Sequence, residues 1–487
     1  MKRTPGIVAV VMMLLVSAVS LPGEPARVQQ PRPNIVIVYV DDMGWTDLSV
    51  QGSVYYETPH IDGLAAQGIR FTNAYAAAAI CSPSRAALLT GRYPARIGVT
   101  DWIRSRFQGG TIPVDKKNPT NYVGETHERL LTPPNPLWME HEEITLAELL
   151  KPAGYVSAHI GKWHLGADDW YPETQGFDIN IGGSDYGQPP SYFDPYFRKG
   201  QGDIPTLKPR REGEYLTDRE ADEAVAFIRG NRGQPFFLYL SHYAVHTPIQ
   251  ARADLRARYA AKPKTNQTNP DYAAMVHSVD QSVGRVLAAL DQAGLTERTL
   301  VMFTSDNGGL LGPTHNAPLR SGKGHPYEGG IRVPFIVRWP GIVPAATISY
   351  APTMGIDVLP TVARAAGLTP LTDGPIDGIS LVEHLRSGGT QTLERQALFW
   401  HFPHYRNGHD IPPYSVVRNG DWKLIRWSEG PRFELYNLRE DLGEAKNVAE
   451  TMPQKVAELD AQLAGWQRDV GAKLPRPNPA YRPAARR

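Results

Sequence analysis

The stretch Asn34-Ile-Val-Ile-Val-Tyr-Val40, followed at once by Asp41-Asp42, decides the fold class of this chain. A continuous apolar run of β-branched residues is typical of a central strand whose two faces are both covered. Such a strand belongs in a sheet that carries helices on both sides. The abrupt change to two aspartates predicts that the strand ends there, at the edge where α/β sheets hold their ligands.

The segments that follow alternate between helical and extended patterns. Thr58-Pro59 offers an N-cap and a proline for the first turn of a helix, and Gly68 follows its last apolar position. Strands that alternate with helices predict a mostly parallel sheet. The further strands that we expect are 69–75, 155–160, 236–240 and 299–304, and the further helices are 145–150, 221–229 and 272–293.

The pattern changes from about residue 390. Asn419-Gly420-Asp421 lies between extended segments at 415–418 and 422–427, which is a strong hairpin signal, and 433–438 offers another strand. Apolar side chains then recur on one face of a last helix that includes Leu459, Leu463 and Trp466. We therefore expect an α/β fold with a large mixed, mostly parallel sheet sandwiched by helices, and a small C-terminal α+β domain of antiparallel strands and one helix.

Length and composition indicate where the domains begin and end. The 487 residues exceed one ordinary core. Residues 1–23 resemble a signal peptide, because an apolar run too short to span a membrane follows Lys2 and Arg3. We expect cleavage, a secreted or periplasmic protein, and no membrane attachment afterwards. The expected parts are a signal peptide at 1–23, a large domain at 32–385, a small domain at 386–475 and a loosely ordered tail at 476–487.

Charge and cysteine content limit the possible partners. The chain has 51 basic and 50 acidic side chains, so no long-range field favours nucleic acid. Its single cysteine, Cys81, excludes an internal disulfide in a compartment where disulfides would form. A lone thiol in that setting calls for a chemical reason.

The segment Cys81-Ser-Pro-Ser-Arg85-Ala-Ala-Leu-Leu-Thr-Gly-Arg92 is the most informative one. Pro83 shapes a turn, Ser84 can cap, and a helix that begins at Arg85 would point its N-terminus at Cys81 and favour anions there. The alternative is a buried structural cysteine, because cysteine is among the most buried residue types.

This segment resembles the sulfatase signature Cys-x-Pro-Ser-Arg followed by Leu-Thr-Gly-Arg. The resemblance implies the formylglycine-dependent (type I) sulfatase family, of the arylsulfatase and N-acetylgalactosamine-sulfatase kind, with an alkaline-phosphatase-like fold. In that family a formylglycine-generating enzyme oxidises the cysteine to an aldehyde before the chain folds, and the aldehyde hydrates to a gem-diol. The resemblance spans about residues 33–385 and weakens beyond them.

Two pairs of oxygen-bearing side chains follow predicted strands. Asp41-Asp42 and Asp306-Asn307 lie at carboxyl ends of strands, so they should meet at one edge of the sheet. Oxygen ligands alone favour calcium over zinc. The resemblance adds Cys81, as formylglycine, to the ligands of one Ca²⁺ ion. Either pair alone would more often be a loop cap or a solvated strand end.

Three further segments are similar to sulfatase motifs. Gly161-Lys162-Trp-His164-Leu-Gly166 corresponds to the block in which the lysine grips sulfate and the histidine bonds the diol. His246 matches the histidine that contacts the ester oxygen, although Val245 replaces a proline often found before it. Lys323 resembles the second sulfate-binding lysine.

By analogy with the family, one hydroxyl of the diol attacks sulfur while His246 protonates the departing alcohol. His164 then takes the proton of the second hydroxyl and sulfate leaves. The catalytic residues that the resemblance implies are Cys81, Arg85, Lys162, His164, His246 and Lys323.

The substrate is less well defined by the sequence. Aromatic and polar residues in the variable loops would suit a sugar ring, but the same aromatics could equally pack the two domains together. The resemblance favours sulfated glycans such as galactose or N-acetylgalactosamine sulfates, with aryl sulfates as surrogates. The loop residues are Asp101, Trp102, Ser184, Asp185, Tyr186, Tyr192, Tyr196 and 401–409.

Two alternatives come from other functional classes. A phosphatase or phosphonate monoester hydrolase of the same superfamily would use a similar sheet and metal-facing carboxylates. A non-catalytic glycan-binding relative would keep the pocket without conversion of Cys81. The Asp-Asn pair and the full set of lysine, histidine and arginine favour the sulfatase.

Overall fold

The computed structural model describes residues 1, 32–104, 116–369, 374–406, 411–430 and 432–483. Its largest element is an eight-stranded sheet in which β1 (Asn34–Val40) lies between β7 and β8 and runs parallel to both. Only β9 is antiparallel to its neighbours, so the expected mixed, mostly parallel sheet is confirmed. The order across the sheet is β10 (Thr347–Ser349), β2 (Ile69–Phe71), β9 (Phe335–Arg338), β8 (Thr299–Ser305), β1, β7 (Phe236–Ser241), β5 (Val156–Gly161) and β6 (Ile179–Ile181).

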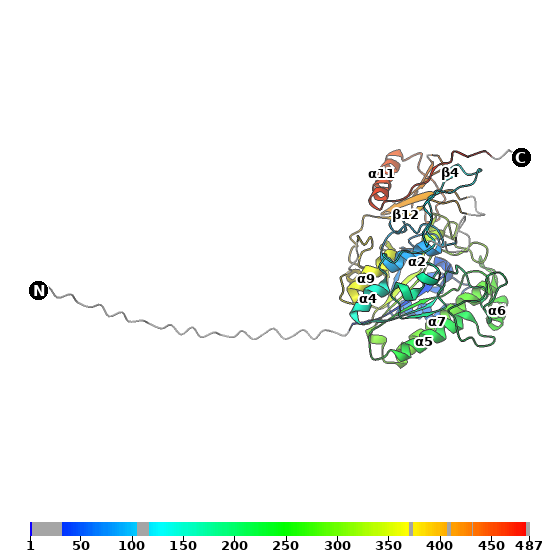
Figure 1. Cartoon of the computed structure of the whole chain (residues 1–487), viewed down its shortest axis with the longest axis vertical. Coiled ribbons are helices and arrows are strands. Elements are labelled where there is room, and N and C mark those ends of the chain that lie inside the picture. Colours follow the sequence, from blue (N-terminus) through cyan, green and yellow to red (C-terminus); the bar gives the residue numbers. More distant parts are fainter. Residues whose placement is uncertain (2–31, 105–115, 370–373, 407–410, 431, 484–487) are drawn as a thin grey trace. The chain divides into compact units, whose positions relative to one another are not determined.

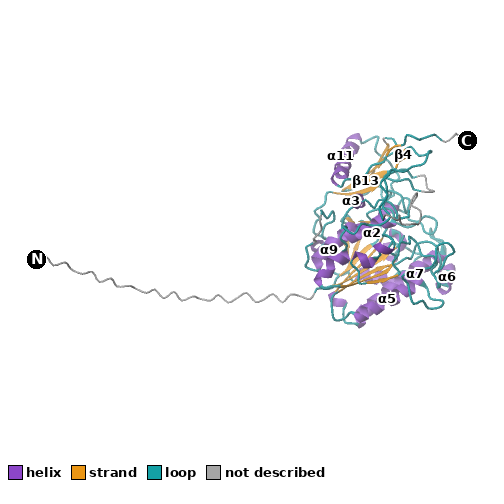
Figure 2. Cartoon of the chain, viewed as in Figure 1, coloured by secondary structure: helices purple, strands orange, loops and turns teal. Residues whose placement is uncertain are grey.

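The apolar run of β1 feeds two hydrophobic cores. Val36, Val38 and Val40 point into one core, and Ile35 and Ile37 into the other, because side chains alternate along a strand. Each fully buried side chain of this kind stabilises the fold by about 1.5–3 kcal/mol. Helices cover both faces, as Figures 1 and 2 show. The first core contains α1 (Pro59–Ala66), α5 (Leu216–Gly230), α6 (Ala253–Ala260) and α7 (Pro270–Gln292), and the second contains α2 (Cys81–Thr90), α4 (Leu146–Leu150), α9 (Val358–Ala365) and α10 (Val382–Arg386).

The C-terminal part forms a four-stranded antiparallel sheet, as expected. Asn419 pairs with Trp422 across a tight turn in which Gly420 has φ 59°, a conformation that suits glycine. The sheet and α11 (Pro453–Asp469) share a third core with Cys81, so this sheet supports the start of α2. Its strands are β12 (Ala397–Phe402), β13 (Tyr414–Asn419), β14 (Trp422–Trp427) and β15 (Arg432–Asn437).

Two expectations need correction. The strand predicted at 69–75 is divided into β2 and β3 (Ala74–Tyr75), and β3 pairs with β11 (Thr353–Met354) in a separate sheet. The tail expected to be loose from residue 476 is held through residue 482. There β16 (Arg476–Pro477) pairs with β4 (Leu130–Leu131), and the buried Asn478 side chain donates to the Glu128 carbonyl at 2.8 Å. Backbone pairing outweighs the irregular composition of this segment.

The remaining elements are short. None of the helices in the described part of the chain is long and apolar enough to cross a membrane. The expected signal peptide lies outside the described residues, except for Met1. Short helices lie at α3 (Pro94–Ile97) and α8 (Glu328–Ile331), with 3-10 turns at Trp45–Asp47, Ser49–Gln51, Lys151–Ala153, Asp168–Trp170, Pro172–Gln175, Thr296–Arg298 and Gly355–Asp357.

Candidate active site

The predicted site residues meet at one edge of the large sheet. β5, β7, β1 and β8 are adjacent and parallel, so their carboxyl ends share that edge. Backbone hydrogen bonds join the segments beyond the strands: Asp306 N–H donates to Val40 O at 3.1 Å, and Lys162 N–H donates to Ser241 O at 2.6 Å. Val245 N–H likewise donates to Asp41 O at 2.8 Å. The predicted convergence of the two Asp-containing pairs is therefore present.

Cys81 begins helix α2, whereas we expected the helix to begin at Arg85. Pro83 fits the first helical turn because its missing N–H needs no partner there. Ser84 does not cap the helix, since its Oγ accepts from Ala78 N–H at 3.1 Å and donates to Ala78 O at 2.9 Å. Cys81 is 4% exposed, and burial raises the pKa of its thiol.

Arg85 ties three strand ends together. Its Nε and Nη2 donate to Asp306 Oδ2 at 3.0 and 2.8 Å. Its Nη1 donates to Lys162 O at 2.9 Å and to Ser241 Oγ at 2.6 Å. Charge-assisted bonds of this kind fix geometry, and Arg85 is 1% exposed. A spacing of four residues on α2 thus connects Cys81 to the ends of β8, β5 and β7.

Two lysines pair with the two aspartates that follow β1. Lys162 Nζ lies 2.6 Å from Asp41 Oδ2, and Lys323 Nζ lies 2.6 Å from Asp42 Oδ1. Burial opposes ionisation of Asp42, but the charge of Lys323 holds its pKa well below the ordinary value. Three buried carboxylates thus face three buried cations. We call this group the site cluster, made of Asp41, Asp42, Arg85, Lys162, Asp306 and Lys323.

Both predicted histidines line the same cavity as Cys81. His164 Nε2 lies 3.0 Å from Ile103 O, and its Nδ1 is buried without a hydrogen-bond partner among the described residues. Burial and the charge of Lys162 lower the pKa of His164 well below its ordinary value. Gly187 is needed beside it, because a Cβ there would come within 2.7 Å of the imidazole.

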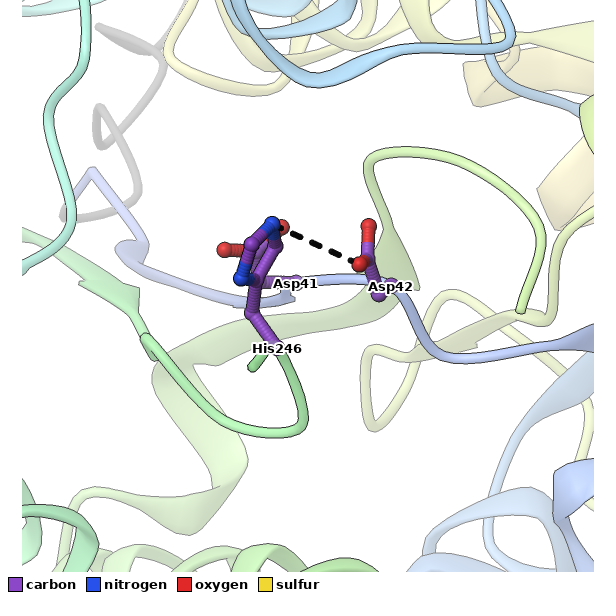
Figure 3. A group of neighbouring side chains, drawn as sticks. All are labelled: Asp41, Asp42 and His246. Carbon is purple, nitrogen blue, oxygen red and sulfur yellow. Dashed lines mark ion pairs between the residues drawn. The ribbon is translucent and has the colours of Figure 1, made fainter. Parts of the chain in front are cut away.

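His246 faces Asp42 from the loop after β7, with Nε2 at 3.6 Å from Asp42 Oδ2 (Figure 3). Its Nδ1 lies 2.9 Å from Thr247 O. Burial and the charge of Lys323 lower the pKa of His246 to about 3.

The backbone is unusual at two of these positions. Asp42 has φ 60° and His164 has φ 61°, in a region that residues other than glycine rarely occupy. Such conformations persist only where the surrounding structure enforces them.

The donor set at the sheet edge fits a cation. One ligand atom each from Asp41, Asp42 and His246 lies within 4.8 Å of the others. Asp41 Oδ1 and Asn307 Oδ1 are buried without a hydrogen-bond partner among the described residues. Buried oxygens without partners are costly unless a ligand uses them. Asp306 is already engaged, because Oδ1 accepts from Asp42 N–H at 3.1 Å and Oδ2 from Arg85.

The cavity has a volume of about 460 Å³. Its lining shows which of the predicted loop residues face it. Trp102 and Tyr186 line it, whereas Tyr192 and Tyr196 are fully buried and do not. Tyr192 instead donates to Tyr243 O at 2.6 Å and so supports the loop that carries His246. The lining residues are Ile80, Cys81, Trp102, Ile103, Arg104, His164, Tyr186, Gly187, Gln188, Gln201, His246, Lys323 and Arg406.

The remaining loop residues have other surroundings. The Asp185 carboxylate forms an ion pair with Arg104, and Asp101 Oδ1 accepts from Trp102 N–H at 2.8 Å. Ser184 O accepts from His164 N–H at 2.9 Å. His401 is buried, and its Nδ1 lies 2.8 Å from Ser415 Oγ. Residues 407–409 lie outside the described part of the chain.

Three polar residues of the cavity were not predicted, and a fourth was named only as part of a loop segment. Arg104, Gln188 and Gln201 belong to or adjoin loop segments that the sequence analysis named, and Arg406 lies inside the named 401–409 segment. In the sequence, Arg104 and Gln188 lie close to Trp102 and Tyr186, and that closeness was the available signal. Nothing in the sequence separated them from ordinary surface residues.

Comparisons with known proteins agree with this geometry. The sulfatase family model matches residues 33–368, and a model described as N-sulphoglucosamine sulphohydrolase, C-terminal, matches residues 322–469. A sulfatase of Formosa agariphila is 34% identical, covering 92% of this chain and 90% of its own length. The N-acetylgalactosamine-6-sulfatase of Mus musculus is 33% identical, covering 90% of this chain and 80% of its own.

A solved structure extends the likeness to three dimensions. The crystal structure of Ps i-CgsB in complex with k-i-k-neocarrahexaose has a TM-score of 0.75 and 29% identity, covering 90% of this chain and 93% of that one. The phosphonate monoester hydrolase of Agrobacterium radiobacter, at 21% identity and a TM-score of 0.67, shares the fold. The chain therefore belongs to the sulfatase family of the alkaline phosphatase superfamily and is a sulfuric ester hydrolase.

Proposed function

We propose that this protein hydrolyses a sulfate ester of a glycan, using formylglycine made from Cys81 and one calcium ion. The observation that carries the proposal is the position of Cys81, at the first residue of α2, between the site cluster and an open cavity. The positive end of a helix favours an anion at that point, as a sulfate ester requires.

The cysteine itself is poorly suited to the reaction. Burial raises the pKa of the Cys81 thiol, so the thiolate, the reactive form, is disfavoured. The hydrated aldehyde supplies a hydroxyl as nucleophile and a second hydroxyl whose proton loss releases sulfate. At 4% exposure, Cys81 offers little access in the folded chain. A formylglycine-generating enzyme would therefore act before folding.

The cations of the site cluster would bind and orient the sulfate group. Lys162 and Lys323 each lie 2.6 Å from an aspartate oxygen that follows β1, so both ammonium groups are fixed in place. Fixed positive charge stabilises the negative oxygens of a transferring group. Arg85 would act by positioning, because its N–H groups are bonded to Asp306, Lys162 O and Ser241.

The two histidines would move protons. His246 would hold the proton for the departing alcohol oxygen. Its pKa of about 3 is low for that task. A bound sulfate ester would raise this pKa, because added negative charge favours the imidazolium. His164 would accept a proton through Nδ1, which has no other partner among the described residues.

Calcium would be held by Asp41, Asp42, Asp306 and Asn307, beside the formylglycine at position 81. Carboxylate and amide oxygens suit a hard cation, and two of these side chains have buried oxygens without a hydrogen bond to any described residue. The ion would supply positive charge for the sulfate and for the nucleophile. His246 also lies near Asp42, and imidazole nitrogen is a ligand that suits zinc. The metal analysis must therefore distinguish calcium from zinc.

The substrate is proposed to be a sulfated saccharide, such as a galactose or N-acetylgalactosamine sulfate, with aryl sulfates as surrogates. Trp102 and Tyr186 line a cavity of about 460 Å³, and aromatic faces suit sugar rings. The relatives include N-acetylgalactosamine-6-sulfatases and a structure in complex with neocarrahexaose. We also propose that the protein is secreted or periplasmic. The boundary between its large and small domains is proposed to lie at residues 385/386.

A turnover assay separates this function from its alternatives. We expect release of sulfate from an aryl sulfate at a rate far above that of phosphate from the matching aryl phosphate. Metal analysis should find one calcium and no zinc per chain. Faster phosphate release would support the phosphatase or phosphonate hydrolase, and binding of a sulfated glycan without turnover would support the non-catalytic relative.

A further inference from the structure

Among the described residues, one cation of the cavity is neither used by the proposed chemistry nor paired with a carboxylate. Three cationic side chains line it, and two are already paired: Lys323 lies 2.6 Å from Asp42 Oδ1, and Arg104 forms an ion pair with Asp185. The third is Arg406, whose side chain donates to the backbone carbonyl of Lys323. Within the described ranges, no carboxylate lies within ion-pair distance of its guanidinium.

The backbone around Lys323 is shaped to receive this guanidinium. Gly324 has φ 86°, and a Cβ at this position would overlap the Arg406 side chain. Glycine suits this conformation, and the Arg406 side chain lies against the space that a Cβ would occupy. Arg406 N–H donates to Ile411 O at 3.2 Å, which fixes its own backbone. The charge is thus held beside Lys323, a member of the site cluster.

Most of the hydrogen-bonding capacity of Arg406 remains unused. A guanidinium has five N–H donors, and one carbonyl acceptor engages this one among the residues described. Burial lowers the pKa of Arg406, which means that the site disfavours an unpaired charge. A partly buried arginine of this kind is best matched by a planar or tetrahedral oxyanion that accepts two bonds.

The sulfate group that is cleaved does not need Arg406 as a partner, because the site cluster already provides cations for it. We propose that Arg406 binds a second anionic group of the substrate, either a carboxylate or another sulfate, while Trp102 or Tyr186 supports the sugar ring. This inference rests on the sulfatase function proposed above and narrows it. The substrate class becomes a glycan with a second negative group close to the ester that is cleaved.

The test compares selectivity between wild type and Arg406→Gln. Four substrates are needed: an aryl sulfate, a neutral monosulfated disaccharide, its disulfated analogue and a monosulfated disaccharide that contains a uronate. Selectivity is the kcat/KM for an anionic disaccharide divided by that for the neutral one, so changes common to both substrates cancel. We expect Arg406→Gln to lower this ratio by about 10- to 100-fold, as for loss of a charge-assisted bond.

Two further variants keep the result interpretable. Arg406→Lys keeps the charge and should retain part of the selectivity, whereas a merely structural arginine would show no such rescue. Arg439→Gln is the matched control, because Arg439 is 76% exposed and pairs with Asp421 outside the cavity. It should leave the ratio unchanged.

Each outcome has a distinct meaning. A loss of selectivity for the disulfated or for the uronate substrate supports the proposal and identifies the anion. An unchanged ratio in Arg406→Gln, or no wild-type preference for a second anion, overturns it. Failure of the wild type on the aryl sulfate as well would contradict the sulfatase function itself.

Discussion

Two clusters of buried charges in this molecule have similar composition and different consequences. The site cluster joins three carboxylates to three cations at the edge of the large sheet. A second group, the sheet-junction cluster of Glu328, Arg332, Lys423 and Glu444, links α8 to β14. Lys423 Nζ lies 3.0 Å from Glu328 Oε1 and 2.8 Å from Glu444 Oε1, and Arg332 Nε lies 3.0 Å from Glu328 Oε2.

The difference lies in the atoms that remain available. Among the described residues, Asp41 Oδ1 and Glu444 Oε1 both have no hydrogen bond, but Arg85 Nη2 is 3.9 Å from Asp41 Oδ1, whereas Lys423 Nζ is 2.8 Å from Glu444 Oε1. Each carboxylate of the sheet-junction cluster lies within 3.0 Å of a cation. Strain does not distinguish the two clusters, because Glu444 has φ 51° and Asp42 has φ 60°. Unused ligand atoms beside a cavity mark a site, whereas buried charge alone does not.

The largest effect of a single substitution on activity should come from a residue beside the site cluster. His246→Ala should lower kcat/KM by about 10²- to 10⁴-fold, the range for loss of a general acid. The loss should be greater for a sugar sulfate than for an aryl sulfate, because a phenol leaves without help from a proton. Thermal unfolding should stay close to that of the wild type, since His246 contributes no paired buried charge that the fold requires. Equal losses on both substrates would contradict the assigned role.

The sheet-junction cluster should show the opposite pattern. Lys423→Met should lower the free energy of unfolding by about 3–5 kcal/mol, because it leaves Glu444 buried without its cation and Glu328 with Arg332 alone. Activity per folded molecule should be unchanged. Adding Glu444→Gln should recover part of the stability in urea unfolding. A loss of turnover in folded Lys423→Met would show that this cluster also serves the site.

Removal of metal should affect both activity and stability. A chelator should abolish sulfate release and lower the unfolding temperature, and calcium should restore both. At 100 times its dissociation constant, the ion should stabilise the fold by about 2.7 kcal/mol. Asp42→Asn should be stabilised less by calcium than the wild type. Restoration by zinc and not by calcium would contradict the proposed ion.

The last effect concerns a buried carboxylate outside both clusters. Asp280 accepts from His60 and Ile61 N–H at 2.9 Å each, and burial raises its pKa from 3.8 to about 7. As pH rises from 3.8 to about 7, the unfolded chain releases this proton and the folded chain keeps it. The free energy of unfolding should therefore fall over that window and then level off. Asp280→Asn should remove this part of the slope in unfolding measured at several pH values.

Much of the fold could be predicted because it depends on local patterns. The apolar run of β1 has the predicted limits, Asn34–Val40, and Gly420 marks the predicted hairpin. The start of α2 was predicted at Arg85, but the helix begins at Cys81. The proline within its first turn indicated that the helix had not yet begun. Pairing of the tail with β4 could not be predicted, since it depends on a segment more than 300 residues away.

The site residues that stand in sequence motifs could be predicted, whereas those whose position depends on packing could not. Cys81, Lys162 and Lys323 stand in motif segments, and the structure brings them together. Tyr192 was named as a loop aromatic, but its side chain is buried beneath the His246 loop. The role proposed for Arg406 rests on its place in the cavity, which the sequence does not show.

The central claim is that residue 81 of the active protein is formylglycine, and one measurement tests it most directly. Mass spectrometry of the tryptic peptide that contains Cys81, taken from protein that releases sulfate, should show a loss of about 18 Da. This change lies outside the usual oxidation ladder of cysteine. An unmodified thiol in fully active protein would contradict the account.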